Sequence, residues 1–365
     1  MNPDPGKKFI IAVPVCETLD ETWRILDGYM ELRPGGFMVG VGGRLPVLAP
    51  AGQPGMVGHQ RLFDFIDLLK RRYPGTFAAV DAVGGDIFNI LQGASPLRSA
   101  RNYTGFLSDA ELRERFEADL EAHVELLAQA GADINFAPLL DVPLPGYRGY
   151  AAGDRRCISD DPGEVIAFGR SFIAAHRRRG IICTAKHFPG YGHLKENPHQ
   201  LLSVEADAWD DKRALEPYSA LCSEGSLQAV MLGHCTTPKH PRVPATLASQ
   251  ALELLRNELH FDGLAVADEL FMGAVNDYYR DPLSGRSDGD PDGERRAVDA
   301  WSLCDLIIVS YPIQNRDGTV MGRPGGERRL PTMVGAVRMA LEDGRIPAAS
   351  WKDSLRRLSA AGLLS

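Results

Sequence analysis

Short runs of hydrophobic residues recur along the chain, and most of them are continuous rather than alternating with polar positions. They begin near residues 37, 77, 132, 180, 227, 263 and 305 and read FMVGVGG, FAAVDAV, ADINFAPLLDV, GIICTAKHF, LQAVMLGHC, GLAVADEL and DLIIVSY. Strands that are apolar on both faces are typical of a parallel sheet covered by helices. These runs therefore predict buried parallel strands.

Longer amphipathic stretches separate these runs. They cover residues 109–130, 162–178, 211–222, 247–259 and 330–342, and each is long enough for a helix that crosses from one strand to the next. The repeating unit is thus one strand followed by one helix. Repeats of this kind build either a closed eight-stranded barrel or an open doubly wound sheet.

The positions of polar residues favour the barrel. No G-x-G-x-x-G motif follows a first strand, although such a motif marks many open sheets that bind dinucleotides. Polar side chains instead follow the ends of several different runs, namely Asp81, Asp141, Lys186 with His187, His234 and Asp268. A closed barrel gathers such strand ends at one rim. We therefore expect an α/β fold, a single (β/α)8 TIM-type barrel over residues 1–365, with a C-terminal helix packed on it.

Composition limits the kinds of binding partner and the cellular compartment that we expect. Hydrophobic residues make up 44% of the 365 residues, and the formal net charge is −8. An acidic chain without a dense Lys/Arg stripe is a poor match for nucleic acid or for anionic membranes. The first apolar run, residues 9–15, is too short for a signal peptide or a membrane span. The six cysteines show no C-x-x-C spacing, which indicates free thiols and a cytoplasmic protein.

The most informative segment runs from Lys186 to His199 and reads KHFPGYGHLKENPH. Its proline and glycines end the preceding strand, so Lys186 and His187 are expected at a strand's carboxyl end. Asp268 ends another apolar run. A lone Asp at a strand–helix junction is often a helix N-cap, and that alternative stays open. Beside His199 as a proton donor, however, a nucleophilic Asp268 would supply the minimum needed to cleave a glycosidic bond.

An ordered set of short motifs resembles glycoside hydrolase family 3, of the single-domain β-N-acetylglucosaminidase type. In chain order the matching pieces are Val80-Asp81 with Gly84-Gly85, GADINFAPLLDV (131–142), Gly153-Asp154-Arg155 with residues 159–162, the 186–199 segment, AVMLGH (229–234), PATL (244–247) and FDGLAVADELFM (261–272). The resemblance as a whole extends over residues 35–345, most of the chain. The ordered set is far more specific than any one piece.

This resemblance implies a retaining exo-β-glycosidase, most directly a β-N-acetylhexosaminidase that acts on terminal β-linked N-acetylglucosamine or a related sugar. Asp268 matches the family's nucleophile, and His199 matches the histidine that serves as general acid and then as base. The residues implied to contact the sugar are Asp81, Arg155, Lys186, His187, His234 and Met272. No metal or organic cofactor is implied, and His187, His193 and His199 lack the usual spacing of metal ligands.

Two departures from the family pattern concern the same site. Asn197 stands where the family has an Asp that pairs with the histidine, and an amide can orient the ring but does not favour its charged form. Residues 81–86 read DAVGGD, where the family usually has DQEGGR followed by a further Arg. Asn89 occupies that further position and is expected to contact the substrate. The sequence therefore predicts an altered sugar subsite and an altered proton-transfer loop.

Two alternative functions share the same scaffold and the same small saccharide ligand. The first is a glycoside phosphorylase or transglycosylase, because an uncharged Asn197 repels phosphate less than a carboxylate does. The second is a catalytically impaired carbohydrate-binding homologue. Retention of both Asp268 and His199 argues against the second, since a binding module has no need of the pair.

Overall fold

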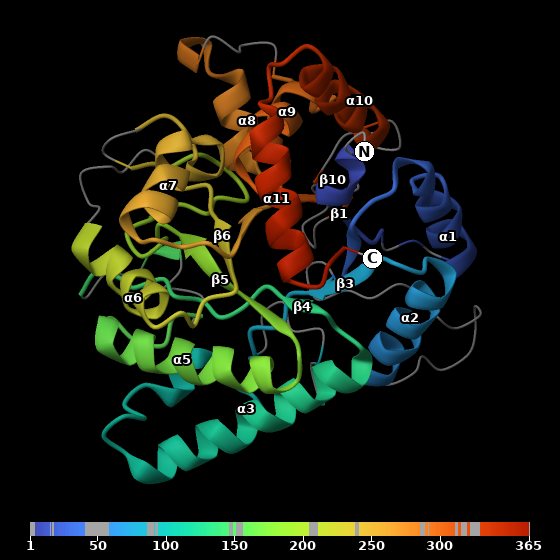
Figure 1. Ribbon diagram of the computed structural model, residues 1–365. Helices are drawn as coiled ribbons and strands as arrows, with labels where there is room; N and C mark the ends of the chain where they lie inside the picture. Colours follow the sequence, from blue (N-terminus) through green and yellow to red (C-terminus); the bar gives the residue numbers. More distant parts are fainter. Residues whose placement is uncertain are drawn as a thin grey trace.

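A closed barrel of eight parallel strands, β1 to β8 in sequence order, forms the centre of the computed structural model (Figure 1). The structure describes residues 4–14, 16, 18–40, 58–85, 91, 94–145, 149–150, 156–203, 211–237, 241–284, 289–290, 292–310, 313–314, 320–321 and 329–364. The strands are β1 (Phe9–Ala12), β2 (Gly36–Val39), β3 (Phe77–Val80), β4 (Ile134–Asn135), β5 (Ile182–Phe188), β6 (Ala229–Leu232), β7 (Leu264–Ala267) and β8 (Leu306–Val309), and a separate antiparallel pair consists of β9 (Ile313–Gln314) and β10 (Val320–Met321). The predicted TIM-type barrel is confirmed.

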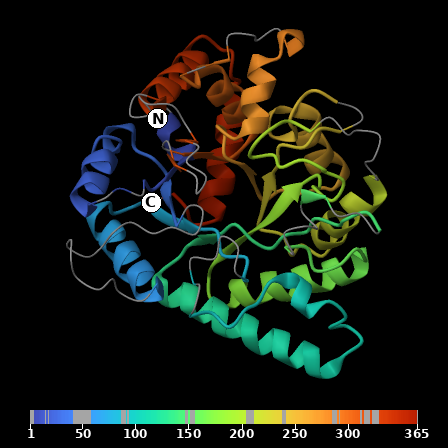
Figure 2. The ribbon, with the colours of Figure 1, turned by 180° about the vertical axis from the view of Figure 1, so that it is seen from behind.

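Helices surround the barrel on all sides, as Figures 1 and 2 show from opposite ends. They are α1 (Leu19–Asp27), α2 (Gly58–Arg72), α3 (Ala110–Ala130), α5 (Pro162–Arg178), α6 (Asp211–Ser223), α7 (Ser249–Glu253), α8 (Gly273–Arg280), α9 (Glu294–Leu303), α10 (Arg329–Glu342) and α11 (Ala348–Ala360). Within the described residues, none of them combines the length and the apolar character needed to cross a membrane.

The strand β1 is the one barrel strand that the sequence pattern did not predict. Its residues are the first part of the apolar run at 9–15, which the sequence analysis treated only as a possible leader or span. In the structure β1 pairs with β2 on one side and with β8 on the other. It therefore closes the barrel, and the seven predicted runs supply β2 to β8.

Two helices show how local sequence sets the element boundaries. The side chain of Asp109 accepts a hydrogen bond from the backbone N–H of Leu112 (3.0 Å) and so caps α3. Gly131, which ends α3, has a left-handed φ of 78° that favours glycine. Asp161 caps α5 in the same way (2.9 Å to the N–H of Gly163), and Pro162 occupies its first turn.

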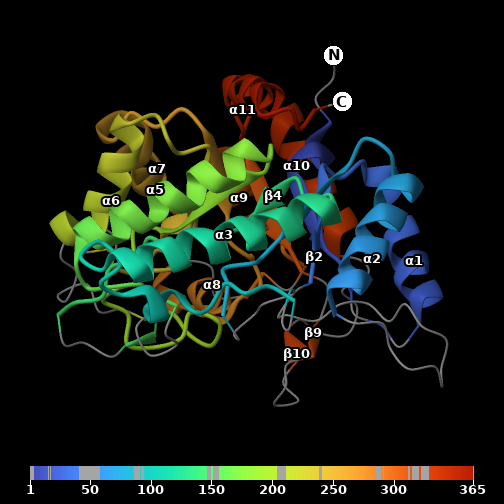
Figure 3. The same cartoon turned by 90° about the horizontal axis from the view of Figure 1, so that it is seen from below.

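Side chains from the strands fill the barrel interior, and α11 closes one end of it. The interior cluster includes Ile10, Phe77, Ile134 and Leu264 from the strand region, together with Leu358 of α11 and Leu363 just beyond it. Figure 3 shows α11 at one end of the barrel and α8 with β9 and β10 at the other. The end opposite α11 is therefore the rim where the strands finish.

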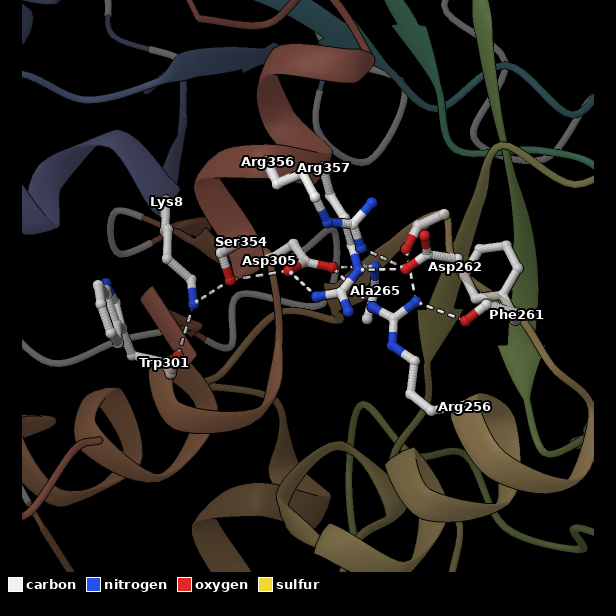
Figure 4. Close-up of polar contacts among 11 residues, drawn as sticks. Lys8, Arg256, Phe261, Asp262, Ala265, Trp301, Asp305, Ser354, Arg356 and Arg357 are labelled. Carbon is white, nitrogen blue, oxygen red and sulfur yellow. Dashed lines mark hydrogen bonds and ion pairs between the residues drawn. The ribbon is translucent and has the colours of Figure 1, made fainter. Parts of the chain in front are cut away.

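A buried polar cluster fastens α11 to the barrel (Figure 4). Asp305, directly before β8, is 1% exposed. Its carboxylate accepts hydrogen bonds from Ser354 Oγ of α11 (2.8 Å) and from the backbone N–H of Ala265 in β7 (2.9 Å). It also pairs with Arg256 (2.8 Å) and with Arg357 of α11 (3.3 Å). A single carboxylate thus joins α11 to two barrel strands.

Lys8 extends this cluster to the start of β1. Its ammonium group donates to the backbone oxygen of Trp301 (2.6 Å) and to Ser354 Oγ (3.1 Å), and it lies 4.0 Å from the centre of the Trp301 ring. Burial lowers the pKa of Lys8 to about 8, while Asp305 acts in the opposite direction. Because β1 and β8 are the first and last strands, these contacts secure the closure of the barrel.

Candidate active site

Polar side chains gather at the carboxyl ends of four barrel strands. Asp81 follows β3, Lys186 and His187 lie near the end of β5, His234 comes two residues after β6, and Asp268 directly follows β7. The helix after Asp268, α8, lies at the end of the barrel opposite α11 (Figure 3). In (β/α)8 barrels this rim is where active sites form.

Lys186 and Asp81 form an ion pair across the rim. The Lys186 Nζ lies 2.8 Å from Asp81 Oδ1, and the two side chains are 2% and 22% exposed. Burial lowers the pKa of Lys186, and the negative charge of Asp81 opposes this shift. Asp268 also acts on Lys186 in the same sense as Asp81, so the pair lies within electrostatic reach of the carboxylate after β7.

Asp141 orients His187. One carboxylate oxygen accepts the backbone N–H groups of His187 (3.2 Å) and Tyr191 (2.7 Å), and the other lies 2.9 Å from His187 Nδ1. A buried carboxylate is an acceptor, so Nδ1 carries the hydrogen and Nε2 is left on the opposite edge of the ring. Asp141 was expected at a strand end from the sequence, but no role was predicted for it.

Tyr191 fills the space between β5 and β6. Its ring stacks on His187 with centroids 4.2 Å apart, and it is 1% exposed. Its hydroxyl oxygen accepts the backbone N–H of His234 (2.6 Å). Gly233 passes so close that an added Cβ would lie 2.6 Å from the Tyr191 hydroxyl. Tyr191 is therefore a packing residue that links two strand ends.

Asp268 is held as a carboxylate. Its Oδ1 accepts the backbone N–H of Glu269 (2.8 Å), and its own N–H donates to the carbonyl oxygen of Leu232 in β6 (3.2 Å). Burial by itself would raise the pKa of Asp268, but His234, His187, the Glu269 N–H and His199 together hold it below its usual value. The alternative that Asp268 caps the next helix is wrong, because α8 begins at Gly273 with Met272 as its N-cap residue.

His234 and Met272 are both buried, in the segments that follow β6 and β7. His234 is 1% exposed; its Nε2 lies 2.9 Å from the carbonyl oxygen of Glu269 and its Nδ1 lies 3.0 Å from Thr246 Oγ1. Burial lowers the pKa of His234, against the influence of Asp268. Met272 is 3% exposed. Both residues are thus positioned by the segments that follow β6 and β7.

Asn197 sets the orientation of His199. The Asn197 Oδ1 accepts the backbone N–H of His199 (2.9 Å) and lies 2.9 Å from its Nδ1. A backbone N–H can only donate, so the amide oxygen faces the ring and Nδ1 must carry a hydrogen. Proton exchange therefore belongs to Nε2. Burial lowers the pKa of His199 to about 4, Asp268 opposes this shift, and the positive groups around it add to it.

The loop that carries His199, residues 197–202, is fastened to α8. The backbone N–H groups of Gly273 and Ala274 donate to the carbonyl oxygens of His199 (3.0 Å) and Pro198 (3.0 Å). Asp277 of α8 accepts the N–H of Leu202 (3.0 Å). Because α8 follows Asp268 in the chain, these bonds fix the histidine and the carboxylate relative to each other.

Other expected site residues fall outside the described residues, and two unexpected ones lie beside His199. Arg155 and Asn89 are not among the described positions.

Arg156 and Tyr150 lie near His199 and were not expected there from the sequence. Arg156 is buried, and its NH1 lies 3.4 Å from the hydroxyl of Tyr150, which in turn lies 3.4 Å from His199 Nδ1. In the described part of the chain, no three or more His, Cys, Asp or Glu side chains are grouped as metal ligands.

Comparison with known proteins places the chain in a family. Residues 99–359 match the glycosyl hydrolase family 3 N terminal domain, which is more than half of the chain. The chain belongs to glycosyl hydrolase family 3. It is 28% identical to a β-hexosaminidase of Methylococcus capsulatus over 301 residues, which cover 78% of this chain and 83% of that protein. It is 30% identical to a β-hexosaminidase of Xylella fastidiosa over 267 residues, covering 70% and 74%.

Solved structures of two similar proteins share the fold. A β-N-acetylhexosaminidase of Beutenbergia cavernae superposes with a TM-score of 0.74 at 22% identity, covering 99% of this chain and 98% of that chain. A family 3 β-N-acetylglucosaminidase of Paenibacillus gives a TM-score of 0.73 at 24% identity, covering 99% of this chain and 62% of that chain. The chain thus spans less than two thirds of the Paenibacillus protein, and at these identities the likeness concerns the fold.

Proposed function

We propose that this family 3 protein is a retaining exo-β-glycosidase that removes a terminal β-linked N-acetylhexosamine, N-acetylglucosamine or a close relative. One observation carries the proposal: an ionised Asp268 and a His199 whose Nε2 is available for proton exchange are fixed to each other through α8. The β-hexosaminidases that resemble this chain support the choice of substrate.

The proposed reaction has two displacements. In the first, an Asp268 oxygen attacks the anomeric carbon, the bond to the glycosidic oxygen breaks, and that oxygen takes the proton of His199 Nε2 as the alcohol leaves. In the second, His199 removes a proton from water, the water oxygen attacks the same carbon, and the Asp268 carboxylate leaves. Two inversions give a product with the β configuration of the substrate.

The remaining rim residues are proposed to hold the sugar. The Asp81–Lys186 pair presents a carboxylate and an ammonium group 2.8 Å apart, which suits adjacent hydroxyl groups that donate and accept. His187 offers its Nε2, while His234 and Met272 would bound the pocket. Arg155 and Asn89 are proposed as further sugar contacts from their place in the sequence.

The lowered pKa of His199, about 4, gives the proposed enzyme an acidic optimum. The first displacement needs His199 protonated and Asp268 ionised, and the pKa of Asp268 is also held low. Activity should therefore fall on the alkaline side as His199 loses its proton. Because Asn197, beside Nδ1, is uncharged, no carboxylate at that position stabilises the protonated form of His199.

Chromogenic β-N-acetylglucosaminides, together with a slow 2-fluoro sugar as a trap, test the proposal. Turnover in buffer and a mass increase on the peptide that contains Asp268 are the expected results, with Asp268→Asn unlabelled and Asp343→Asn, far from the rim, labelled like wild type. A sugar phosphate formed in the presence of phosphate would make the protein a phosphorylase, the alternative that the uncharged Asn197 favours. Tight sugar binding without turnover or label would make it a binding protein.

The organisation and location of the protein follow as separate proposals. We propose that residues 1–365 act as one catalytic domain, supported by a barrel that begins at β1 and is closed at its base by α11. We also propose a reducing, cytoplasmic setting without nucleic-acid partners. The six cysteines, all within the described residues, form no disulfide, and Cys157, Cys183, Cys235 and Cys304 are buried thiols. Cell fractionation tests the location.

A further inference from the structure

Tyr150 and Arg156 form a chain of contacts that ends on His199. The Arg156 NH1 lies 3.4 Å from the Tyr150 hydroxyl, and that hydroxyl lies 3.4 Å from His199 Nδ1. Neither residue precedes or follows a barrel strand directly, and neither has a role in the reaction as proposed above. Both residues lie on the Nδ1 side of the His199 ring, where they can affect its orientation and its charge.

Tyr150 is anchored to the same segment that carries His199. Its backbone N–H donates to the carbonyl oxygen of Leu194 (2.9 Å). Its ring lies at an angle to those of Tyr191 and His199, with centroids 6.3 Å and 6.2 Å away. A residue held in this way presents its hydroxyl at a fixed place, so contact with Nδ1 restricts rotation of the His199 ring.

Among the described residues, four charged or titratable groups on different elements act on His199. The groups that act on it are Asp268 after β7, Arg156 before α5, His187 in β5 and His234 after β6. Asp268 favours the charged ring and the other three oppose it. Asn197 and Tyr150, whose oxygen atoms lie within hydrogen-bonding distance of Nδ1, carry no formal charge at neutral pH. Arg156 is the permanent cation of this set, since guanidinium stays protonated at any working pH.

We propose that Tyr150 and Arg156 are positioning residues for the proton transfer: Tyr150 holds the His199 ring, and the Arg156 charge behind it makes that ring a stronger acid. This inference rests on the proposed acid/base role of His199. Asn197 and Tyr150 orient the ring, and the Arg156 charge adds to the acidity that burial gives it. No group other than His199 exchanges a proton with the substrate.

The pH profile of kcat/KM separates this role from a merely structural one. Arg156→Gln should move the alkaline limb upward by about one pH unit, because a nearby positive charge is removed. Arg156→Lys keeps the charge and should return the limb toward its wild-type position. The thermal unfolding of each variant is measured beside its kinetics, so that unfolding of a variant is distinguished from a change in the pH profile of the folded protein.

Leaving-group chemistry tests Tyr150. With an alkyl or other poor leaving group, Tyr150→Phe should lower kcat about tenfold with little change in KM, because proton donation limits the rate. With a dinitrophenyl leaving group, which departs without a proton, kcat/KM, which reports only the first displacement, should stay within about twofold of wild type. Tyr73→Phe is the control. It removes a hydroxyl that donates to Asp27 (2.8 Å), well away from the rim strand ends, and should leave the kinetic constants for both substrates unchanged.

A direct titration of His199 keeps this test independent of the substrate. In nitrogen-15 NMR spectra, with the His199 signal identified by its absence in His199→Gln, Arg156→Gln should raise the midpoint of His199 by about one pH unit. An unmoved midpoint and an unmoved limb overturn the inference. If wild type turns over no glycoside and traps no sugar on Asp268, the proposed function fails instead, whatever the titration shows.

Discussion

At Gly273, a single added methyl group should displace His199 relative to Asp268. It is the first residue of α8, and its N–H donates to the carbonyl oxygen of His199 (3.0 Å). A Cβ built on Gly273 would lie 2.1 Å from the backbone oxygen of Gln200 and 2.2 Å from its carbonyl carbon. Ordinary van der Waals contact begins at 3.4 Å, so Gly273→Ala forces the 197–202 loop to retreat by more than an ångström.

The expected cost to catalysis follows from that displacement. A misplacement of about 1 Å in a catalytic group lowers the rate by about 100-fold, so kcat of Gly273→Ala should fall by about two orders of magnitude. The stability cost should be smaller, about 1–3 kcal/mol, because the change weakens a few hydrogen bonds of a rim loop. KM should change little, since Asp81, Lys186 and His187 lie on other strands.

Steady-state kinetics and thermal unfolding of Gly273→Ala measure both quantities. Gly335→Ala in α10 is the matched control, because its added Cβ meets nothing within 4 Å, and it should keep wild-type kcat. The loss in Gly273→Ala should be largest for substrates with poor leaving groups. If kcat stays within a factor of about two of wild type, the reasoning that α8 positions His199 is refuted.

Three further predictions concern charge and burial. Asn197→Asp should raise the pKa of His199, shift the alkaline limb upward by about 1–2 pH units and so increase activity near neutral pH; a pH profile without any gain contradicts this. His123 and His176 are buried, with pKa values lowered from 6.5 to about 4 and about 3. Their contribution to stability is therefore complete above pH 6.5 and is lost as the pH falls from 6.5 to about 4 for His123 and to about 3 for His176. Urea midpoints at neutral and acidic pH should show this loss, and equal midpoints would count against it. Asp305→Ala should cost about 3–5 kcal/mol, because it leaves buried cations without their carboxylate, while kcat of the folded protein stays at the wild-type value; the exposed Asp343→Ala is the control, and a large loss of kcat in Asp305→Ala would show that the two ends of the barrel are coupled.

Continuous apolar runs predicted seven of the eight strands, because burial on both faces leaves a mark in consecutive residues. The eighth, β1 (FIIA), was missed because the apolar run that contains it, residues 9–15, was considered only as a possible leader or membrane span. The run at 132–142 predicted a longer strand than β4, which has two residues (Ile134–Asn135). Pro138 explains the difference, since proline removes a donor from the ladder, and the chain continues with a single bridge between Leu139 and Lys186.

Site residues that follow strands were also accessible from the sequence. Asp81, Lys186, His187, His234 and Asp268 come at the ends of apolar runs, and a parallel barrel gathers such ends at one rim. Their catalytic and binding roles are proposed from the family resemblance and from the geometry of the rim. Asp141 gave the same signal, but no role was predicted for it. Tyr150 and Arg156 gave no comparable signal, because they lie in connecting segments whose course depends on what they pack against.

The sequence by itself determined the barrel and the kinds of chemical group on its rim, since both depend on local periodicity and on where each run ends. Tertiary structure decided which groups touch. Lys8 reaches Trp301 across 293 positions, and the 197–202 loop meets α8, because closure of the barrel brings distant segments together. It also decided the state of these groups: the low pKa of His199 comes first from burial, which the order of residues along the chain does not reveal.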